Sequence, residues 1–469
     1  MFLESGVVRR IAPWILLVAC VACGNSGADQ SAETEVPVTS ATAAVRPPLQ
    51  WSACADLECS TLSVPVDRAD PSKGSMKLAV YRRVSAQPNS AHIPLIIHPG
   101  GPGADVKQAV QSVDELLAPM IEDFDVYGLS TRGTFDGKGY DCVEFLDDVE
   151  KVDLDANAAK RFADACVAKV PELVGNVGTR DTVEDLEDLK IALNLDAVRF
   201  LGWSYGATIG ATWALLHPKS IDVMVLDAPA DPREHWSEQI PFTFKAGKRS
   251  LIAALDDCDK DSACKGKESL TDVYSHVSEK ALKGSLGTRD YVMSSRDLAL
   301  AVEMPLYDGS FQQLADALRA ADVGDVSKLK DLLFHRLGQT SDRHNDGGIE
   351  TQIGVHCSDM SRADINASLA AIGDGGGVTG FGGAFERICA ALPDAPRPLG
   401  DITVTTAARM ANVMVFASEG DPIIPVEVSS TLARELGWQL RVTPALQHLA
   451  VGFDDNATRE AMNFLRSSR

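Results

Sequence analysis

The stretch from Leu201 to Gly206 constrains the chain more than any other, because it reads G-x-S-x-G around Ser204. The mostly apolar run 198–201 predicts a buried strand before it, and residues 207–216 predict a helix after it. This context is that of a nucleophile elbow, whose sharp turn exposes the serine hydroxyl above the end of a sheet. We therefore predict that Ser204 is a nucleophile and that the Tyr205 amide points to a developing oxyanion. An ordinary strand-to-helix turn is the alternative.

A second turn rich in glycine and proline, His98-Pro-Gly-Gly-Pro-Gly103, follows a short apolar run over residues 94–98. Glycine allows the backbone to approach a ligand closely, and proline restricts the chain, so such a turn suits the wall of a site. Where a nucleophile elbow is present, a turn in this position supplies the second oxyanion N–H group. A plain Gly/Pro turn is the alternative, and the elbow downstream favours the functional interpretation.

Predicted strands and helices alternate along most of the chain. The strand patterns cover residues 124–129, 223–226, 413–417 and 440–442, and the helical patterns cover residues 182–193 and the end of the chain from about 457. Such alternation predicts an α/β fold with a mostly parallel, doubly wound sheet. Residues 76–84 alternate in polarity and predict a strand at the sheet edge. Thr182-x-x-Asp185 predicts a capping box at the start of its helix.

The pattern becomes helical after Pro232 and stays so to about Pro398, for example over residues 310–321 and 326–337. A glycine-rich loop over residues 373–383 interrupts it. We therefore expect a helical lid over residues 233–400 inserted into a core. The two parts of that core are expected at residues 51–232 and 401–469.

The N-terminus has the pattern of an export signal. Two arginines precede the apolar run 11–22, which is too short to span a bilayer. Leu-Val-Ala-Cys20 resembles a bacterial lipobox, and Cys23 is a second candidate for lipidation. Residues 1–23 are therefore predicted to be a signal peptide of the lipoprotein type, with a plain secretory signal as the alternative. Residues 24–50 are rich in Ser, Ala, Thr, Glu and Pro and predict a flexible tether. The mature protein is expected in the cell envelope or secreted.

Eight cysteines remain after the signal, and an even number in an exported protein predicts disulfides. Eight cysteines allow on the order of a hundred connectivities, so spacing alone does not decide among them. Reduced, buried thiols are the alternative. Pairing neighbours in sequence order gives Cys54–Cys59, Cys142–Cys166, Cys258–Cys264 and Cys357–Cys389.

Composition excludes several classes of function. The net charge of −22 disfavours nucleic acid, whose phosphates would repel the chain. No H-E-x-x-H motif and no pair of C-x-x-C motifs occurs, and the one C-x-x-C spacing, Cys20-Val-Ala-Cys23, lies in the targeting segment. We expect no metal and no cofactor, and contact with a membrane only through a lipid anchor.

A serine nucleophile needs a histidine as base and a carboxylate that orients the histidine. Around an elbow these occur in the order Ser, Asp or Glu, His, and Ser204, Asp421 and His448 follow that order. His448 is the one histidine of nine that follows Asp421. Asp227, at the end of the strand after the elbow helix, competes for the role of acid. The Gly-Asp-Pro turn favours Asp421, because it places the carboxylate in a loop that can reach the histidine.

Four motifs together resemble one family, the prolyl aminopeptidase and tripeptidyl aminopeptidase group of serine α/β-hydrolases, and most closely its exported bacterial members. They are His98-Pro-Gly-Gly-Pro-Gly103, Gly202-Trp-Ser-Tyr-Gly206, Val225-Leu-Asp-Ala-Pro-Ala-Asp-Pro232 and Gly420-Asp-Pro-Ile-Ile-Pro425. The cysteines at 258 and 264 and the segment Val355-His-Cys-Ser-Asp359 are similar to those members as well. The resemblance runs from about Cys54 to Phe453.

This resemblance implies the α/β-hydrolase fold and the release of peptides from a free N-terminus. It implies Ser204, Asp421 and His448 as the triad, with Gly101 and Tyr205 as oxyanion donors. Two places depart from the family pattern. Residues 130–135 read Ser-Thr-Arg-Gly-Thr-Phe in place of Asp-Pro-Arg-Gly-Thr-Gly, and Leu449-Ala450 replaces the glycine that commonly flanks the histidine.

Two other functions stay open. An esterase or lipase would use the same triad on the same fold, because fold does not fix substrate. A non-catalytic surface lipoprotein would not need all three triad residues. Dehalogenases and epoxide hydrolases carry Asp at the elbow, where this chain has Ser204. An aminopeptidase also needs carboxylates near the substrate amine, and the lid offers Glu234, Glu303 and Glu350 as candidates.

Overall fold

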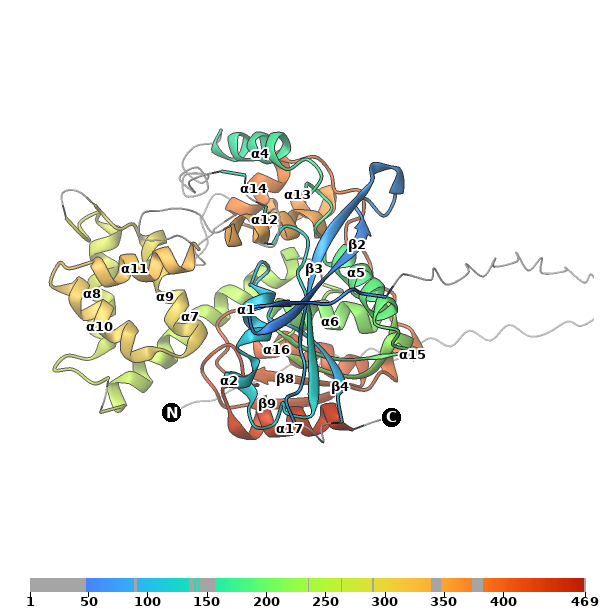
Figure 1. The fold of residues 1–469 in the computed structure, drawn as a ribbon. Coiled ribbons are helices and arrows are strands. Elements are labelled where there is room, and N and C mark those ends of the chain that lie inside the picture. Colours follow the sequence, from blue (N-terminus) through green and yellow to red (C-terminus); the bar gives the residue numbers. More distant parts are fainter. Residues whose placement is uncertain are drawn as a thin grey trace, which may run out of the picture. The chain divides into compact units, whose positions relative to one another are not determined.

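A computed structural model describes most of the chain after the predicted tether (Figure 1). The described residues are 48–87, 91–134, 139–140, 142–143, 157–234, 236–262, 264–288, 291–338, 347–372 and 383–467. The predicted signal peptide, both lipidation candidates, nearly all of the tether and most of the glycine-rich loop 373–383 lie outside these residues. None of the described helices is long and apolar enough to cross a membrane.

One sheet of nine strands organises the described chain, in the order β1-β2-β3-β5-β4-β6-β7-β8-β9. The pairs from β1 to β5 are antiparallel, and every pair from β5 through β4 to β9 is parallel. The strands are β1 (Ser52–Cys54), β2 (Leu57–Pro65), β3 (Ser75–Arg83), β4 (Ile93–His98), β5 (Phe124–Leu129), β6 (Val198–Trp203), β7 (Ile221–Asp227), β8 (Val413–Ser418) and β9 (Gln439–Thr443). The predicted α/β class with a mostly parallel sheet is confirmed.

Helices cover both faces of this sheet because strand side chains alternate between two apolar cores. Phe200 packs with α5 (Thr179–Ala192), α6 (Tyr205–Leu216) and α16 (Val426–Leu436). Its neighbour Leu201 packs on the opposite face with α1 (Val106–Gln111), α2 (Val113–Leu117) and α17 (Asp455–Arg466). The parallel strands are therefore buried on both sides, and their carboxyl ends meet at one edge.

Two local predictions are wrong. The strand predicted at 76–84 is present as β3, but β3 lies between β2 and β5 and not at the edge. The sequence signal was misleading because β2 pairs with β3 along nearly its whole length and β1 pairs with the far side of β2. Helix α5 begins at Thr179 after the cap Gly178, so Thr182 is inside the helix and forms no capping box. The Asp185 carboxylate instead binds the guanidinium groups of Arg68 and Arg132.

Arg132, in the segment that departs from the family pattern, is a structural residue beneath the sheet edge. Its side chain is fully buried and binds the Asp185 carboxylate through Nε at 2.6 Å. Its terminal nitrogens donate to the backbone oxygens of Pro65, Val66 and Asn176. The segment therefore joins β2, α5 and the loop before α5, and its arginine is not a site residue.

The chain between β7 and β8 forms a set of helices with a core of their own. Figure 1 shows α8 to α11 together in one group, and α12 to α14 in a second group with α4 (Ala158–Lys169), in agreement with the helix contacts. The helices are α7 (Trp236–Lys260), α8 (Leu270–Leu282), α9 (Ser295–Asp308), α10 (Phe311–Asp322), α11 (Ser327–Arg336), α12 (Gly348–Asp359), α13 (Arg362–Ile372) and α14 (Ala384–Ala391); α15 (Thr406–Arg409) precedes β8.

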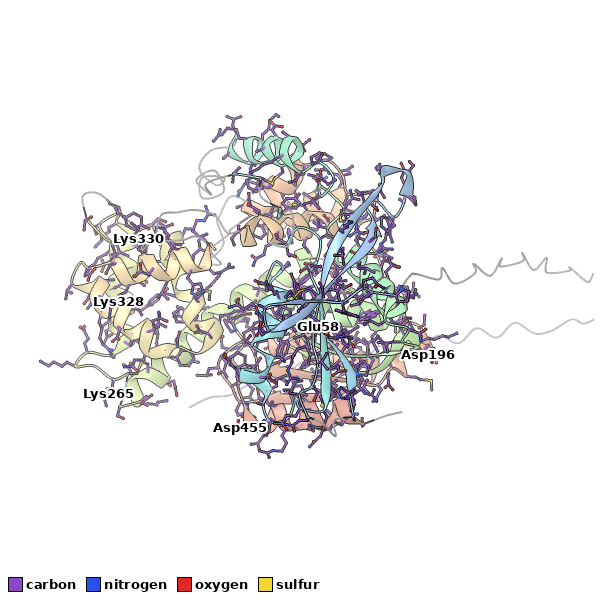
Figure 2. The ribbon with its side chains drawn as sticks, viewed as in Figure 1. Glu58, Asp196, Lys265, Lys328, Lys330 and Asp455 are labelled. Atoms are coloured by element: carbon purple, nitrogen blue, oxygen red, sulfur yellow. A yellow bond between two sulfur atoms is a disulfide. The ribbon has the colours of Figure 1, made fainter. Side chains whose placement is uncertain are left out.

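Charged side chains cover the outside of these inserted helices (Figure 2). Lys328 and Lys330 both project from α11, and Lys265 follows α7. The Lys330 ammonium lies 5.0 Å from the centre of the Tyr291 ring and 5.2 Å from that of Phe334. Its stem and charge thus cover aromatic surface that would otherwise face water.

Four disulfides link neighbouring segments, in the same pairs that sequence order gives: Cys54–Cys59, Cys142–Cys166, Cys258–Cys264 and Cys357–Cys389. The first closes the β1–β2 hairpin. The other three lie in the core of the inserted helices, where the second ties α4 to the chain after β5 and the fourth ties α12 to α14.

Candidate active site

Ser204 occupies a strained turn between β6 and α6. Its φ of 55° and ψ of −124° are rare for a residue with a side chain, and its amide donates to the Asp227 carbonyl at 2.8 Å. A Cβ atom on Gly202 would lie 2.4 Å from the Gly206 carbonyl oxygen, and one on Gly206 would lie 2.2 Å from that of His98. Both flanking glycines are therefore required by close backbone packing.

His448 connects Ser204 to Asp421 through two hydrogen bonds. Its Nε2 lies 2.7 Å from the Ser204 hydroxyl, and its Nδ1 lies 2.7 Å from the Asp421 carboxylate. The histidine and the aspartate are fully buried, and the serine is 6% exposed. The second Asp421 oxygen accepts from the amides of Ile423 and Ile424, both at 2.8 Å. The structure thus brings together the three residues predicted as a triad, from the ends of three different strands.

Burial raises the pKa of Asp421, and His448 and the two amides act in the opposite direction. An aspartate in this position holds the proton on Nδ1, so that Nε2 is free to accept the serine proton. The two hydrogen bonds therefore suit the activation of Ser204 as a nucleophile.

Asp227, the competing acid, is placed differently. One oxygen of its buried carboxylate accepts from the amides of Ala450 at 2.9 Å and Val451 at 2.7 Å. Asp227 therefore holds the backbone that follows His448 rather than the imidazole itself. Burial raises the pKa of Asp227 to about 7, because the two amides and His448 compensate only part of the lost hydration.

The predicted oxyanion donors lie in the elbow itself and in the turn after β4. Tyr205 is the first residue of α6, and the amides of a first helical turn have no acceptor within their own helix. Gly101 lines the same cavity as Ser204 and Tyr205. A Cβ atom on its neighbour Gly100 would lie 2.4 Å from the Trp203 carbonyl oxygen, so this glycine is what allows the turn after β4 to pack on the elbow.

Tyr307, near the end of α9, is a site residue that the sequence analysis missed. Its ring centre lies 4.8 Å from that of His448, and its carbonyl oxygen accepts from the His448 amide at 3.1 Å. Tyr307 also lines the same cavity as Ser204. No motif surrounds Tyr307, and only the tertiary placement of α9 brings it to the elbow.

A cavity of about 720 Å³ opens at Ser204 between the sheet edge and the inserted helices. Glu234 and Glu303, two of the predicted amine-binding candidates, line it. Glu303 is already paired with Arg336 at 2.6 Å. Glu350 is not among the lining residues, because its buried carboxylate accepts from the amides of Cys142 and Val143. Further acidic side chains on the wall are Asp231, Asp359, Asp364 and Glu386.

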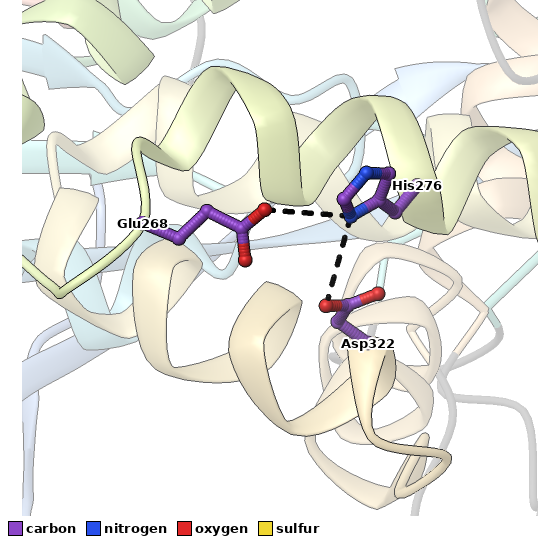
Figure 3. Close-up of side chains that lie close together, drawn as sticks. All are labelled: Glu268, His276 and Asp322. Carbon is purple, nitrogen blue, oxygen red and sulfur yellow. Dashed lines mark ion pairs between the residues drawn. The ribbon is translucent and has the colours of Figure 1, made fainter.

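A group of possible metal ligands lies elsewhere, on the outside of α8 and α10 (Figure 3). The His276 Nδ1 is 3.7 Å from Glu268 and 3.9 Å from Asp322. The Asp322 carboxylate is also 2.7 Å from the Lys280 ammonium. Figure 3 shows the imidazole between the two carboxylates, an arrangement of partly exposed ion pairs.

The comparison with known proteins agrees with this geometry. Residues 93–253 match the family model described as alpha/beta hydrolase fold. Serine protease Hip1 of Mycobacterium tuberculosis is 25% identical over 466 residues, which cover 88% of this chain and 87% of that protein. Tripeptidyl aminopeptidase of Streptomyces coelicolor is 24% identical over 350 residues, which cover 67% and 64%. Carboxylesterase B of Mycobacterium tuberculosis is 26% identical over 465 residues, which cover 88% and 86%.

The sheet topology and the matched family model together show that the chain has the alpha/beta hydrolase fold. The resemblance inferred from the four motifs is confirmed, since a tripeptidyl aminopeptidase is among the relatives. The relatives include a protease, an aminopeptidase and a carboxylesterase by name.

Replacing Asp227 by asparagine should change how stability depends on pH. The folded protein holds the Asp227 proton up to about pH 7, whereas the unfolded chain loses it near its ordinary value. The folded state is therefore penalised progressively as pH rises from about 4 to about 7. Asparagine stays neutral and retains an oxygen for the two amides. Urea unfolding should show the variant gaining stability over the wild type across this interval, by up to about 4 kcal/mol. The exposed Asp196 is the control, and Asp196→Asn should follow the wild type. A constant difference between Asp227→Asn and wild type from pH 4 to 8 would contradict the prediction.

Proposed function

We propose that this hydrolase is a serine peptidase that releases amino acids or short peptides from free N-termini through an acyl-enzyme. Ser204 is the nucleophile, His448 the base and Asp421 the residue that orients the base. The observation that carries the proposal is the pair of 2.7 Å hydrogen bonds that connects these three side chains at the mouth of a cavity.

The reaction follows from the positions of the groups. Ser204 Oγ attacks the carbonyl carbon of the substrate while its proton moves to His448 Nε2. The Gly101 and Tyr205 amides bind the oxyanion that forms on the carbonyl oxygen. The imidazolium then gives the proton to the leaving amine, and the C–N bond breaks. Water attacks the acyl-enzyme by the same path in reverse, with His448 again taking and returning the proton.

Glu234 is the strongest candidate for binding the ammonium group of the substrate. Burial and the nearby carboxylates of Asp231 and Glu238 raise its pKa. Its carboxylate forms no ion pair with the described residues, whereas Asp231 is paired with Arg233 at 2.5 Å. A substrate ammonium would relieve the repulsion on Glu234, so the cavity wall favours a free N-terminus.

An esterase is the second candidate, and the relative named carboxylesterase B supports it. An ester substrate would use the same three residues and the same oxyanion donors. It would not need a carboxylate at the position of Glu234. The preference for a free amine therefore separates the two functions.

Exchange of the two aspartates for asparagine should separate their roles. Asp421→Asn leaves His448 with the wrong tautomer and should lower kcat roughly 10³- to 10⁴-fold. Asp227→Asn keeps the amide contacts and should cost much less. Ser204→Ala should lower kcat by a factor on the order of 10⁴ or more, and its remaining activity is the lowest value expected in the comparison. Steady-state kinetics on one amide and one ester substrate, with folding checked by circular dichroism, test the ranking. A larger loss for Asp227→Asn would reassign the acid, and substantial activity in a folded Ser204→Ala would reject the nucleophile.

Blocking the substrate amine should slow the reaction strongly. Peptide amides with a free N-terminus should be cleaved at least about a hundredfold faster than their N-acetyl forms, which corresponds to roughly 3 kcal/mol. The physical reason is that a blocked substrate leaves a partly buried carboxylate unpaired. Glu234→Gln should reduce the preference, and Glu279→Gln, an exposed position on α8 that does not line the cavity, should leave it unchanged. Equal kcat/KM on free and acetylated peptides would reject the aminopeptidase function without affecting the triad.

The N-terminal sequence supports attachment to the cell envelope. If Cys20 or Cys23 is lipidated, the mature protein should begin at that cysteine and partition into the membrane fraction. Several acyl chains are needed for stable attachment, since one chain binds only marginally. Mass spectrometry of the mature N-terminus tests this, with the Cys20→Ser and Cys23→Ser variants as controls. A mature N-terminus without lipid would overturn the prediction.

A further inference from the structure

The segment Val355-His-Cys-Ser-Asp359 ends in a carboxylate that is joined to the elbow through two hydroxyl groups. Asp359, the last residue of α12, accepts from the Thr179 amide at 2.6 Å and from the Thr179 hydroxyl at 2.5 Å. The same Thr179 hydroxyl lies 2.9 Å from the hydroxyl of Tyr205. All three residues line the cavity at Ser204. The end of α12 is thus linked by side-chain hydrogen bonds to the first residue of α6.

The charge of Asp359 sets the direction of these hydrogen bonds. Burial raises the pKa of Asp359 to about 6, with His356 on α12 acting against the rise and Asp181 on α5 adding to it. Above about pH 7 the carboxylate is therefore ionised and can only accept. The one hydroxyl proton of Thr179 goes to Asp359, so the Thr179 oxygen is left to accept from the Tyr205 hydroxyl. Tyr205 donates to Thr179, and Thr179 donates to Asp359.

The Tyr205 side chain also contacts the turn that carries the other proposed oxyanion donor. Its ring centre lies 6.3 Å from that of His98, with the two rings nearly perpendicular at 81°. The His98 Nδ1 accepts from the Gly100 amide at 3.1 Å, directly before Gly101. Burial lowers the pKa of His98 to about 4, so the ring stays neutral and can accept. A displacement of the Tyr205 side chain would therefore affect the elbow and the turn after β4 together.

We propose that Asp359 is a positioning residue, which acts through Thr179 to hold Tyr205 where its amide meets the oxyanion. The inference rests on the proposed function, because it requires an oxyanion to form at the elbow. During attack the bond from Ser204 Oγ to the carbonyl carbon forms, and the Oγ proton moves to His448. The carbonyl electron pair moves onto the oxygen, to which the Tyr205 amide donates. Asp359 touches none of these atoms and transfers no proton.

The backbone around Asp359 is itself held in place. Its carbonyl oxygen accepts from the Leu399 amide at 3.0 Å. Two residues earlier, Cys357 forms the disulfide with Cys389 of α14. An oxyanion donor is most effective when its position needs no rearrangement during the reaction. A carboxylate fixed in this way is a suitable anchor for the hydrogen bonds that end at Tyr205, and it gives the inserted helices a role beside roofing the cavity.

Helix capping is the structural alternative, because Asp359 also accepts the amide of the first residue of α5. Asp259 does the same for α8, accepting from the Leu270 amide at 2.7 Å. Asp259 does not line the cavity. Asp259→Asn is therefore the matched control, since it changes an aspartate at a helix start that has no connection to the elbow.

The test uses Thr179→Val, which removes the hydroxyl with little change of shape, and Thr179→Ser, which restores it. Asp359→Asn is the third variant, because its oxygen can still accept the Thr179 amide while its NH₂ group cannot accept the Thr179 hydroxyl. The probes are a phenylalkyl trifluoromethyl ketone, which adds Ser204 Oγ to form an oxyanion, and the corresponding carbinol, which cannot. The inhibition constants of both, with kcat and KM on a p-nitrophenyl ester, are measured at about pH 8, where Asp359 is ionised.

Loss of an oxyanion donor costs on the order of 10²- to 10³-fold in rate, and a displaced donor should cost less. We expect Thr179→Val and Asp359→Asn to lower kcat and weaken the ketone by about tenfold each. KM and the inhibition constant of the carbinol should stay close to wild type. Thr179→Ser should recover most of the loss, and Asp259→Asn should match the wild type.

Unchanged kcat and ketone affinity in Thr179→Val and Asp359→Asn would overturn the inference and leave the proposed function in place. Equal weakening of ketone and carbinol would also overturn it, because the cavity as a whole would then have changed. So would an equal loss of activity in Asp259→Asn, since capping of a helix would then be sufficient. A wild-type protein that a fluorophosphonate does not label at Ser204 would instead reject the proposed nucleophile.

Discussion

The arrangement of the site depends on Asp227, which joins two segments that are far apart in the sequence. Its carbonyl oxygen accepts from the Ser204 amide, and its carboxylate accepts from the amides of Ala450 and Val451. Asp227 is the last residue of β7, which pairs with β6 on one side and β8 on the other. A displacement of this single residue would therefore move the elbow and the histidine loop relative to each other. The proton transfer proposed between Ser204 and His448 needs a short hydrogen bond, so it depends on the position of Asp227.

The burial of Asp227 near Asp421 also has an electrostatic consequence. Asp227 and Asp421 are both fully buried, and the charge of Asp421 raises the cost of ionising Asp227. In the proposed reaction His448 becomes positively charged, and a charged His448 lowers the pKa of both carboxylates. Ionisation of the two buried acids is therefore less costly when His448 is charged than when it is neutral. In the proposed mechanism this favours the charged histidine that forms during attack.

The sequence predicted the parts of this site that local patterns determine. Gly202 and Gly206 flank Ser204 because a Cβ atom at either position would collide with backbone. The crowding therefore requires glycine at both positions, and this requirement can be recognised in the sequence as a motif. The order of Ser204, Asp421 and His448 follows from the order of strands in the sheet. The relation of Asp227 to the histidine loop was not predictable, since its two partners are backbone amides, which leave no trace in residue identity. The edge position expected of β3 failed for a similar reason, as strand neighbours are set by long-range pairing.

Tyr307 is a further residue whose position could not be predicted from the sequence. It lies in a helix whose sequence contains no motif, in a region whose pattern indicates only helices, yet its ring packs on His448 and it lines the cavity at Ser204. Helix α9 ends at Gly309, whose left-handed φ of 77° turns the chain beside Gln447, next to His448. An insertion that only covered the cavity would need no such fitted contact with the histidine loop. The placement of α9 therefore argues that the inserted helices and the sheet edge form one site, in which the sheet positions the reacting groups and the insertion encloses and completes them.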